Sequence, residues 1–200
     1  MSNEEINLLR NEMRKILLLV LACISLYAIQ KKDIVPVMEQ KINNATAIIV
    51  KKDLTLNEKA NMIFPLFNDV FDYALMTKLS LGKSNWIKMS SEQRDEFTKK
   101  FIEQLKNSFV DKISIYTDEK LNIIGLKELN SKRTILLTQL VGTKESYDIA
   151  YKFYKTKTGD WLIYDVDILG ISLIQIYRSQ FNNILEHESY ETLLGKIASK

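Results

Sequence analysis

Two carboxylates two residues apart are the clearest candidates for chemistry in this chain. Asp165 and Asp167 fall in a stretch of strand-like composition, so both are predicted to point to one face of a strand. Paired carboxylates in a pocket can perform general acid–base catalysis. Solvation or pairing with lysine explains the same spacing without any reaction, and we favour that interpretation.

Other reactive residues are scarce, which excludes several classes of site. The chain has one histidine, His187, within Glu-His-Glu, where we expect it to be exposed, and one cysteine, Cys23. Histidine-rich metal clusters, cysteine zinc sites and intrachain disulfides are therefore excluded.

The two nearest glycines, Gly159 and Gly170, are 11 positions apart, so no glycine-rich phosphate loop can form. The net charge of +3 comes from scattered residues, which argues against a nucleic-acid partner.

The amino terminus has the pattern of an export signal. Arg14 and Lys15 precede an uncharged run, 16–30. As a helix this run would span about 22 Å, which is short for a bilayer core of ~30 Å. We predict a cleavable signal peptide over 1–28, cut after Ala28, and hence an exported protein. A lipid anchor at Cys23 and an uncleaved membrane anchor are the two alternatives.

The remaining chain, 29–200, reads as one domain whose first part, 29–118, is helical. Apolar residues at helical spacing predict a helix over 33–50. Thr55 and Glu58 form a capping-box signature for the next helix, in which Pro65 predicts a kink or break. Ser90 and Gln93 give a second capping signal, before a long amphipathic helix.

The segment 119–169 reads as a sheet and 170–200 as closing helices. Strand-like stretches cover 121–129, 134–141, 146–156 and 161–169, and turn signals at 142–145 and 158–160 make neighbouring strands antiparallel. After Gly170 an apolar stripe at helical spacing begins at Ile171, and a last short helix covers 189–198. The predicted fold class is therefore α+β, a four-stranded antiparallel sheet with one face covered by several helices. The aromatic residues on the meeting faces allow either a dense core or a cavity.

Two groups of motifs resemble one known family. The first runs from Phe71-Asp72 through Leu81-Gly82 to Trp86 and is followed by Ser91-Glu-Gln-Arg94. The second comprises Tyr164-Asp165-Val166, then Gly170-Ile-Ser-Leu173, then Tyr177-Arg178 with Phe181. In order and spacing these motifs are similar to the MlaC family of periplasmic phospholipid-binding proteins, also called toluene-tolerance or Tgt2 proteins. The resemblance covers about 33–198. Asp167 and Leu169 depart from the expected apolar and acidic residues, which puts the strand register in doubt.

The resemblance implies a fold, a ligand and a role. It implies a nuclear-transport-factor-like sheet that packs with helices around a deep apolar lipid pocket. It implies a monomeric periplasmic carrier with phospholipid as its bound ligand, no other cofactor and no catalysed reaction. The implied partners are an outer-membrane lipoprotein complex and an inner-membrane ABC transporter. The implied roles are outer-membrane lipid asymmetry and organic-solvent tolerance.

On this basis we assign the pocket walls residue by residue. The sheet wall is predicted to comprise Tyr147, Ile149, Tyr151 and Phe153, with Tyr164, Val166 and Ile168 beside them. The opposing wall is predicted to comprise Phe67, Phe71, Phe101, Leu105, Phe109, Ile171 and Ile174. The alternative is that these residues simply fill a core, as we expect of Trp86 and Trp161.

Arg178 has two interpretations. Arginine binds phosphate oxygens well, so this side chain could meet a lipid headgroup at the pocket mouth. The alternative, which we favour, is an ion pair with a carboxylate such as Asp165.

Two alternatives to a lipid carrier remain, an enzyme and an interaction module. Cone-like folds of the nuclear-transport-factor type also host isomerases and dehydratases that use an aspartate base and a tyrosine, and Tyr151 with Asp165 could mimic them. The protein could instead be an interaction module attached to a membrane through Cys23 or through the uncleaved run 16–30.

Overall fold

The computed structural model describes residues 29–114, 119–143 and 145–198. The predicted signal peptide and Cys23 lie outside these residues. Within the described ranges no helix is long and apolar enough to cross a membrane.

The first half of the described chain is helical. It comprises a short 3-10 turn, η1 (Lys31–Asp33), and then α2 (Ile34–Ile49), α3 (Leu56–Phe67), α4 (Tyr73–Leu81), α5 (Lys83–Lys88) and α6 (Ser91–Ser114). Both predicted capping signals are confirmed. Thr55 and Glu58 form a complete capping box at the start of α3. Ser90 and Gln93 exchange backbone–side-chain hydrogen bonds of 2.9 and 3.2 Å before α6.

Helix α3 continues past the proline expected to disturb it. Pro65 lies inside the helix, which ends two residues later at Phe67. The chain then turns, and the Asp72 carboxylate accepts a 2.8 Å hydrogen bond from the backbone N–H of Leu75 to cap α4. Pro65 therefore does not break α3 at its own position: the helix ends two residues later, and α4 begins separately at Tyr73.

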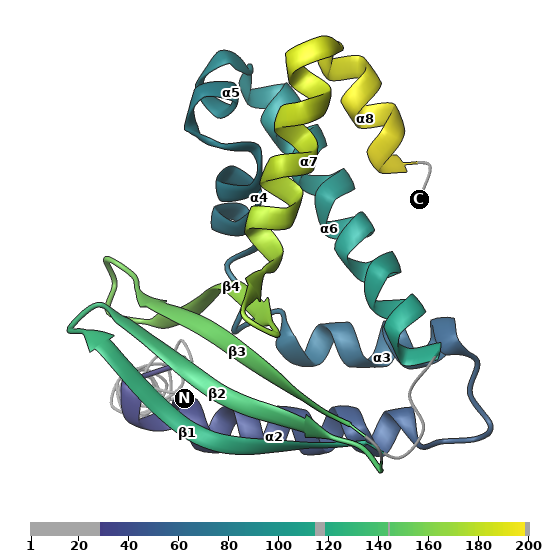
Figure 1. Ribbon diagram of the computed structural model, residues 1–200, viewed down its shortest axis with the longest axis vertical. Helices are drawn as coiled ribbons and strands as arrows, with labels where there is room; N and C mark the ends of the chain where they lie inside the picture. The colour runs from purple at the N-terminus through teal and green to yellow at the C-terminus, as the bar shows by residue number, and fades with distance from the viewer. Residues whose placement is uncertain (1–28, 115–118, 144, 199–200) are drawn as a thin grey trace, which may run out of the picture.

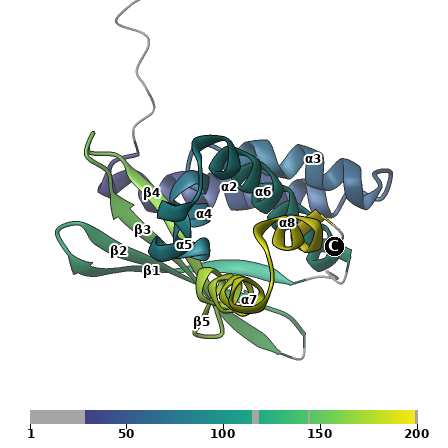
Figure 2. The same cartoon turned by 90° about the horizontal axis from the view of Figure 1, so that it is seen from above.

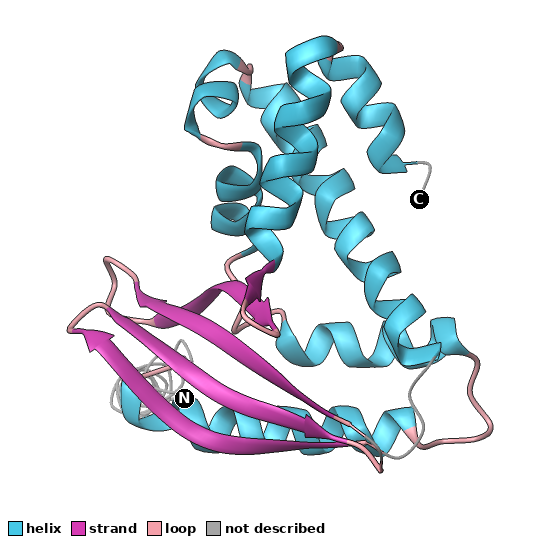
Figure 3. Ribbon diagram, viewed as in Figure 1, coloured by secondary structure: helices cyan, strands magenta, loops and turns pink. Residues whose placement is uncertain are grey.

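The second half forms one antiparallel sheet and the closing helices. The strands are β1 (Lys120–Asn130), β2 (Arg133–Val141), β3 (Ser146–Lys155), β4 (Trp161–Ile168) and β5 (Ile171–Ser172), paired in chain order. They are followed by α7 (Leu173–His187), which ends at the exposed His187, and α8 (Tyr190–Ala198). The fold class is α+β, as predicted (Figure 3).

The prediction of four strands is wrong by one, and the turn after β4 gives the reason. Leu169 and Gly170 adopt positive φ angles of 54° and 78°, and the Leu169 N–H donates a 2.9 Å hydrogen bond to the carbonyl of Asp148. This tight turn sends the chain back along β4, so Ile171 and Ser172 pair with it before α7 begins. Ile171 therefore belongs to a strand, where sequence spacing placed it in a helix.

The elements form two parts that meet near β4. Helix α2 lies along the sheet, while α4, α5, α7 and α8 gather at the other end of the molecule, and α6 runs between the two (Figures 1 and 2). One buried cluster joins α4, α6, α7 and α8 and contains Phe97, Phe101 and Phe181. A second joins α2 to the sheet around Leu136 and Phe153. A smaller third cluster lies between α2, α3 and α6.

Candidate functional site

Strand β3 presents a row of large apolar side chains to one face of the sheet. Its residues Tyr147, Ile149, Tyr151 and Phe153 lie opposite Leu140, Thr138, Leu136 and Thr134 of β2 in register. On the other side, Ile149 pairs with Ile168 and Tyr151 with Val166 of β4. Because side chains alternate along a strand, all six predicted members of the sheet wall named here share one face.

Tyr164 does not belong to this face, and its predicted placement is wrong. The β3–β4 register shifts between Lys152 and Phe153, so one extra residue of β4 lies at this point. Tyr164 instead contacts groups on the opposite face. Its ring lies 6.0 Å from the ring of Tyr154 and 4.3 Å from the Arg133 guanidinium.

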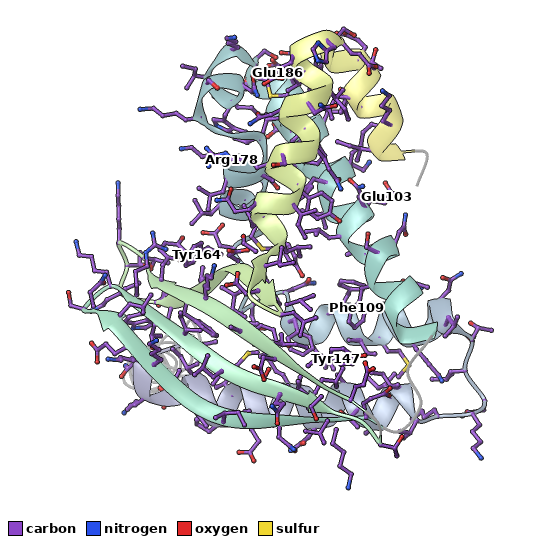
Figure 4. All side chains as sticks on the ribbon, viewed as in Figure 1. Glu103, Phe109, Tyr147, Tyr164, Arg178 and Glu186 are labelled. Atoms are coloured by element: carbon purple, nitrogen blue, oxygen red, sulfur yellow. The ribbon has the colours of Figure 1, made fainter. Side chains whose placement is uncertain are left out.

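The apolar face is closed at one end and open at the other. Phe153 is fully buried beneath α2, Tyr151 and Ile149 are half-buried, and Tyr147 is 37% exposed. The apolar side chains of β3 are therefore part of the core at the Phe153 end and are left partly uncovered toward the start of the strand. Figure 4 shows Tyr147 and Phe109 in the part of the molecule between β3 and α6.

The predicted opposing wall divides between different clusters. Phe67 and Phe71 pack against the cluster on the sheet, and Phe67 also contacts the third cluster together with Phe109. Phe67 and Phe71 therefore lie against the sheet, and Phe109 belongs to the third cluster, which Phe67 also contacts. Phe67 and Phe109 come from α3 and α6, and Phe71 from the segment between α3 and α4.

The other four members of that wall lie elsewhere, so its prediction as one surface is wrong. Phe101 and Ile174 are buried in the cluster of α4, α6, α7 and α8, and Leu105 packs against it. Ile171 is 59% exposed in β5. Helix α6 explains the division, because its 24 residues extend from the helical cluster to the third cluster.

The sequence analysis missed apolar residues of β1 and α3. Ile123 and Leu126 pack against the cluster on the sheet, and Phe64 lies 5.2 Å from Phe109, edge to face. The alternation in β1 is broken by a register shift between Ile123 and Gly125, which hides the pattern. For Phe64 the signal was present, since it belongs to the apolar stripe predicted for this helix but was not assigned to the pocket wall.

Asp165 has a structural role on the opposite face. Its carboxylate accepts hydrogen bonds from Ser172 Oγ (2.7 Å) and from the backbone N–H of Ile174 (3.2 Å), and it lies 3.0 Å from Lys152 Nζ. Asp167 Oδ1 lies 2.6 Å from the same ammonium. The favoured pairing of the two carboxylates with lysine is confirmed. Burial lowers the pKa of Lys152, but hydrogen bonds to Asp167 and Asp165 outweigh this and raise it overall.

This arrangement separates the residues of the enzymatic alternative. Tyr151 points to the apolar face, whereas Asp165 pairs with Lys152 on the other face of the same two strands. A tyrosine and an aspartate on opposite sides of a sheet cannot act on one substrate atom. Burial among apolar groups raises the pKa of Tyr151 to about 12, which keeps its hydroxyl neutral.

Arg178 does not pair with Asp165 as we favoured. Its guanidinium packs over Gly82, where an added Cβ would lie 3.3 Å from Nε. Gly82 has φ of 79°, a conformation that only glycine adopts readily. Figure 4 places Arg178 on α7 well away from Tyr147 and Phe109. Arg178 therefore fixes α7 against the end of α4, at a distance from the open end of the apolar face.

Two hollows lie among the helices. One, of about 360 Å³, is formed by α6, α7 and α8, and the other, of about 260 Å³, lies between α3 and α6. Neither is lined by a predicted lipid-binding residue. In the described part of the chain no group of three or more histidine, cysteine, aspartate or glutamate side chains could hold a metal ion.

The architecture is that of an α+β protein in which one apolar sheet face is only partly covered by helices. The family model of the MlaC protein matches residues 39–199. The chain belongs to the MlaC family.

One curated relative and one solved structure extend this result. Over 114 residues the chain is 27% identical to the intermembrane phospholipid transport system binding protein MlaC of Haemophilus influenzae. That match covers 54% of the chain and 52% of the relative, so the chain spans about half the length of the relative it matches. The fold matches a phospholipid-binding protein from Ralstonia solanacearum, solved in complex with a phospholipid, with a TM-score of 0.68. The identity there is 16%, and the match covers 82% of this chain and 94% of that one.

Proposed function

We propose that this protein is a phospholipid carrier that holds acyl chains against the open end of the apolar sheet face. The observation that carries the proposal is the gradient along β3, from the fully buried Phe153 to Tyr147, which is 37% exposed. An ordinary core residue of this size is covered by other side chains. The uncovered row, with Phe67 and Phe109 nearby, has the chemistry of a site for hydrocarbon.

The energetics of acyl chains explain why such a site needs no catalytic group. Two tails have roughly thirty methylenes, and hiding them from water is worth on the order of 24 kcal/mol at ~0.8 kcal/mol each. That exceeds the practical limit of noncovalent affinity, about 18–21 kcal/mol. The tails therefore move between apolar environments, bilayer and protein, where the hydrophobic terms nearly cancel. The direction of transport then comes from other components.

The wider role that we propose is supported by the family and by the similar proteins. We propose that the chain acts in the periplasm and carries phospholipid between an outer-membrane lipoprotein complex and an inner-membrane ABC transporter. Membership of the MlaC family supports this role, as does the similarity to the intermembrane phospholipid transport system binding protein of Haemophilus influenzae. The predicted signal peptide supports export, and the neutral Tyr151 and engaged Asp165 support carriage without reaction.

The first test is to express the full chain, purify the exported form without detergent and analyse its organic extract by mass spectrometry. We expect about one phospholipid per protein. A lipid-free, well-folded protein would contradict the proposal, and the enzyme and interaction-module interpretations would then gain support.

A charge on the apolar face locates the site. Ile149→Glu places a carboxylate in the middle of the β3 row, and we expect the bound lipid to fall at least about tenfold because burying an unpaired charge is costly. The matched control is Leu137→Glu, on the opposite face of β2, which should keep its lipid. If Ile149→Glu fails to fold, the bound lipid is measured instead in Tyr147→Glu, which lies at a more exposed position of the same row. Full lipid content in folded Ile149→Glu or Tyr147→Glu would show that the wall is wrongly assigned.

A further inference from the structure

An exposed leucine has an unusual backbone conformation at the turn between β4 and β5. Of the residues that the structure describes, Leu169 is the only one other than glycine with a positive φ angle, 54°. A bulky residue rarely adopts this left-handed conformation, because its Cβ crowds the following carbonyl oxygen. Leu169 is also 58% exposed. The position therefore combines a strained backbone with an apolar side chain in water.

The turn itself requires neither of these features. Leu169 and Gly170 form a two-residue loop in which both φ angles are positive, the pattern of a type I′ hairpin turn. Asn-Gly is a preferred sequence for this turn, since asparagine tolerates the conformation and is polar. Leu169 is also one of the two positions that depart from the family motifs, where an acidic residue is expected. The fold therefore does not explain the leucine.

Strand pairing connects the turn to the apolar face that we propose holds acyl chains. Ile168 pairs with Ile149 of β3, and Ile171 pairs with Ile168 across the turn. Directly opposed residues of an antiparallel pair lie on the same face, so the three isoleucines form a row across β3, β4 and β5. Ile171 therefore extends the sheet wall to the edge of the sheet, and is not part of the opposing wall to which the sequence analysis assigned it.

The exposure of this row increases toward the turn. Ile149 is half-buried, Ile168 is 45% exposed and Ile171 is 59% exposed. No residue from Ile168 to Tyr177 is charged, so these exposed side chains offer hydrocarbon and no partner for an ion. Because the surface is continuous with the proposed acyl-chain site, an acyl chain that lies along the row would cover it.

We propose that Leu169 and Ile171 form an apolar lip that contacts the bound acyl chain at the edge of the sheet. The lip depends on the proposed function, because it is an extension of the same acyl-chain site. Burial of these side chains against hydrocarbon stabilises the lipid complex, whereas the lipid-free protein leaves them exposed. The strain at Leu169 then has a functional reason, since asparagine would relieve it but would place a polar group beside the chain.

The test compares the exported protein with its variant Leu169→Asn. Asparagine suits the turn, so relief of strain should raise the melting temperature of the delipidated protein by about 2–4 °C. Labelled phosphatidylethanolamine is then partitioned between each protein and vesicles of the same lipid. We expect the partition to shift about tenfold toward the vesicles, as the loss of a leucine buried against hydrocarbon predicts. A lower melting temperature would overturn the proposal, because it would show that Leu169 packs within the fold.

Two further variants make the comparison specific. The matched control is Leu129→Asn, the same substitution at a 51% exposed position of β1, at the opposite edge of the sheet. It should leave the partition unchanged. Ile171→Thr keeps a β-branched side chain that suits a strand and should shift the partition in the same direction as Leu169→Asn. It provides the measurement at the lip if Leu169→Asn does not fold.

The outcomes separate the lip from the proposed function. A wild-type protein that takes up no phospholipid overturns both. If the wild-type protein binds phospholipid and the folded lip variants keep its partition, only the lip is overturned. Slower exchange of lipid with vesicles at an unchanged partition also overturns it, because the two residues would then contact the membrane surface and not the bound chain.

Discussion

The helical cluster and the open end of the sheet face have similar side chains but opposite degrees of closure. Phe97, Phe101 and Phe181 are in ring contact with one another and are at most 2% exposed. Tyr147, Ile149 and Phe109 are likewise large and mainly apolar, yet each keeps part of its surface uncovered. Composition therefore does not distinguish a core from a ligand site in this protein. The difference lies in whether a second layer of side chains covers the first.

The largest expected effect contrasts the two regions directly. Phe101→Ala removes a fully buried ring and should lower the free energy of unfolding by about 3–5 kcal/mol. Tyr147→Ala should lower it by a small fraction of that and should reduce bound phospholipid instead. Urea unfolding of both variants and lipid analysis of their extracts provide the measurement. Equal losses of stability would mean that the open end of the face is ordinary core.

A smaller effect is expected where the two regions are joined. Asp165 binds Lys152 of β3, Ser172 and the backbone N–H of Ile174. Its removal leaves the partly buried ammonium with Asp167 alone and leaves two donors at the start of α7 unsatisfied. Asp165→Ala should lower the free energy of unfolding by about 3 kcal/mol. Asp167→Ala, which removes only one contact to the same lysine, is the control and should cost clearly less. A loss no greater than that of the control would show that this link contributes little.

The smallest expected effect is a pH dependence from the apolar face. Burial raises the pKa of Tyr151 to about 12, above the value of 10.0 for a free tyrosine. The folded state then holds its proton more tightly, so the stabilisation is complete below pH 10 and is lost as the pH rises toward 12. Tyr151→Phe has no such proton, and its stability should fall less between pH 10 and 12. Parallel stability curves of the two proteins over this range would contradict burial of the hydroxyl.

The sequence was sufficient for the features that depend on local patterns. The capping boxes at Thr55 and Ser90 set the starts of α3 and α6, because side chains there satisfy free backbone donors. Alternation along β3 correctly placed Tyr147 through Phe153 on one face. These inferences needed only neighbouring residues, since helix and strand periodicities are local.

The features that were missed depend on backbone irregularities and on contacts distant in sequence. The bulge beside Lys152 turned Tyr164 away from the wall, and no residue type in β4 signals it. Phe101 and Phe109 have the same helical spacing, yet α6 carries them into different clusters. Asp165 pairs with Lys152 and not with Arg178 because β3 and β4 place Lys152 and Asp165 side by side. Spacing along the chain does not reveal this strand pairing.

The two-residue turn at Leu169 and Gly170 restricts how such a chain can change in length during evolution. β5 is only two residues long and leads directly into α7, so the turn sets where the whole closing helix starts and which side of it meets α4. An inserted residue here would displace the start of α7 and so disturb the packing of Phe181 in its cluster. The turn of the β3–β4 hairpin, 156–160, lies at the tip of two paired strands, so an insertion there can lengthen the loop without displacing either strand. Length variation among descendants of this chain should therefore collect in that hairpin and spare the turn before α7.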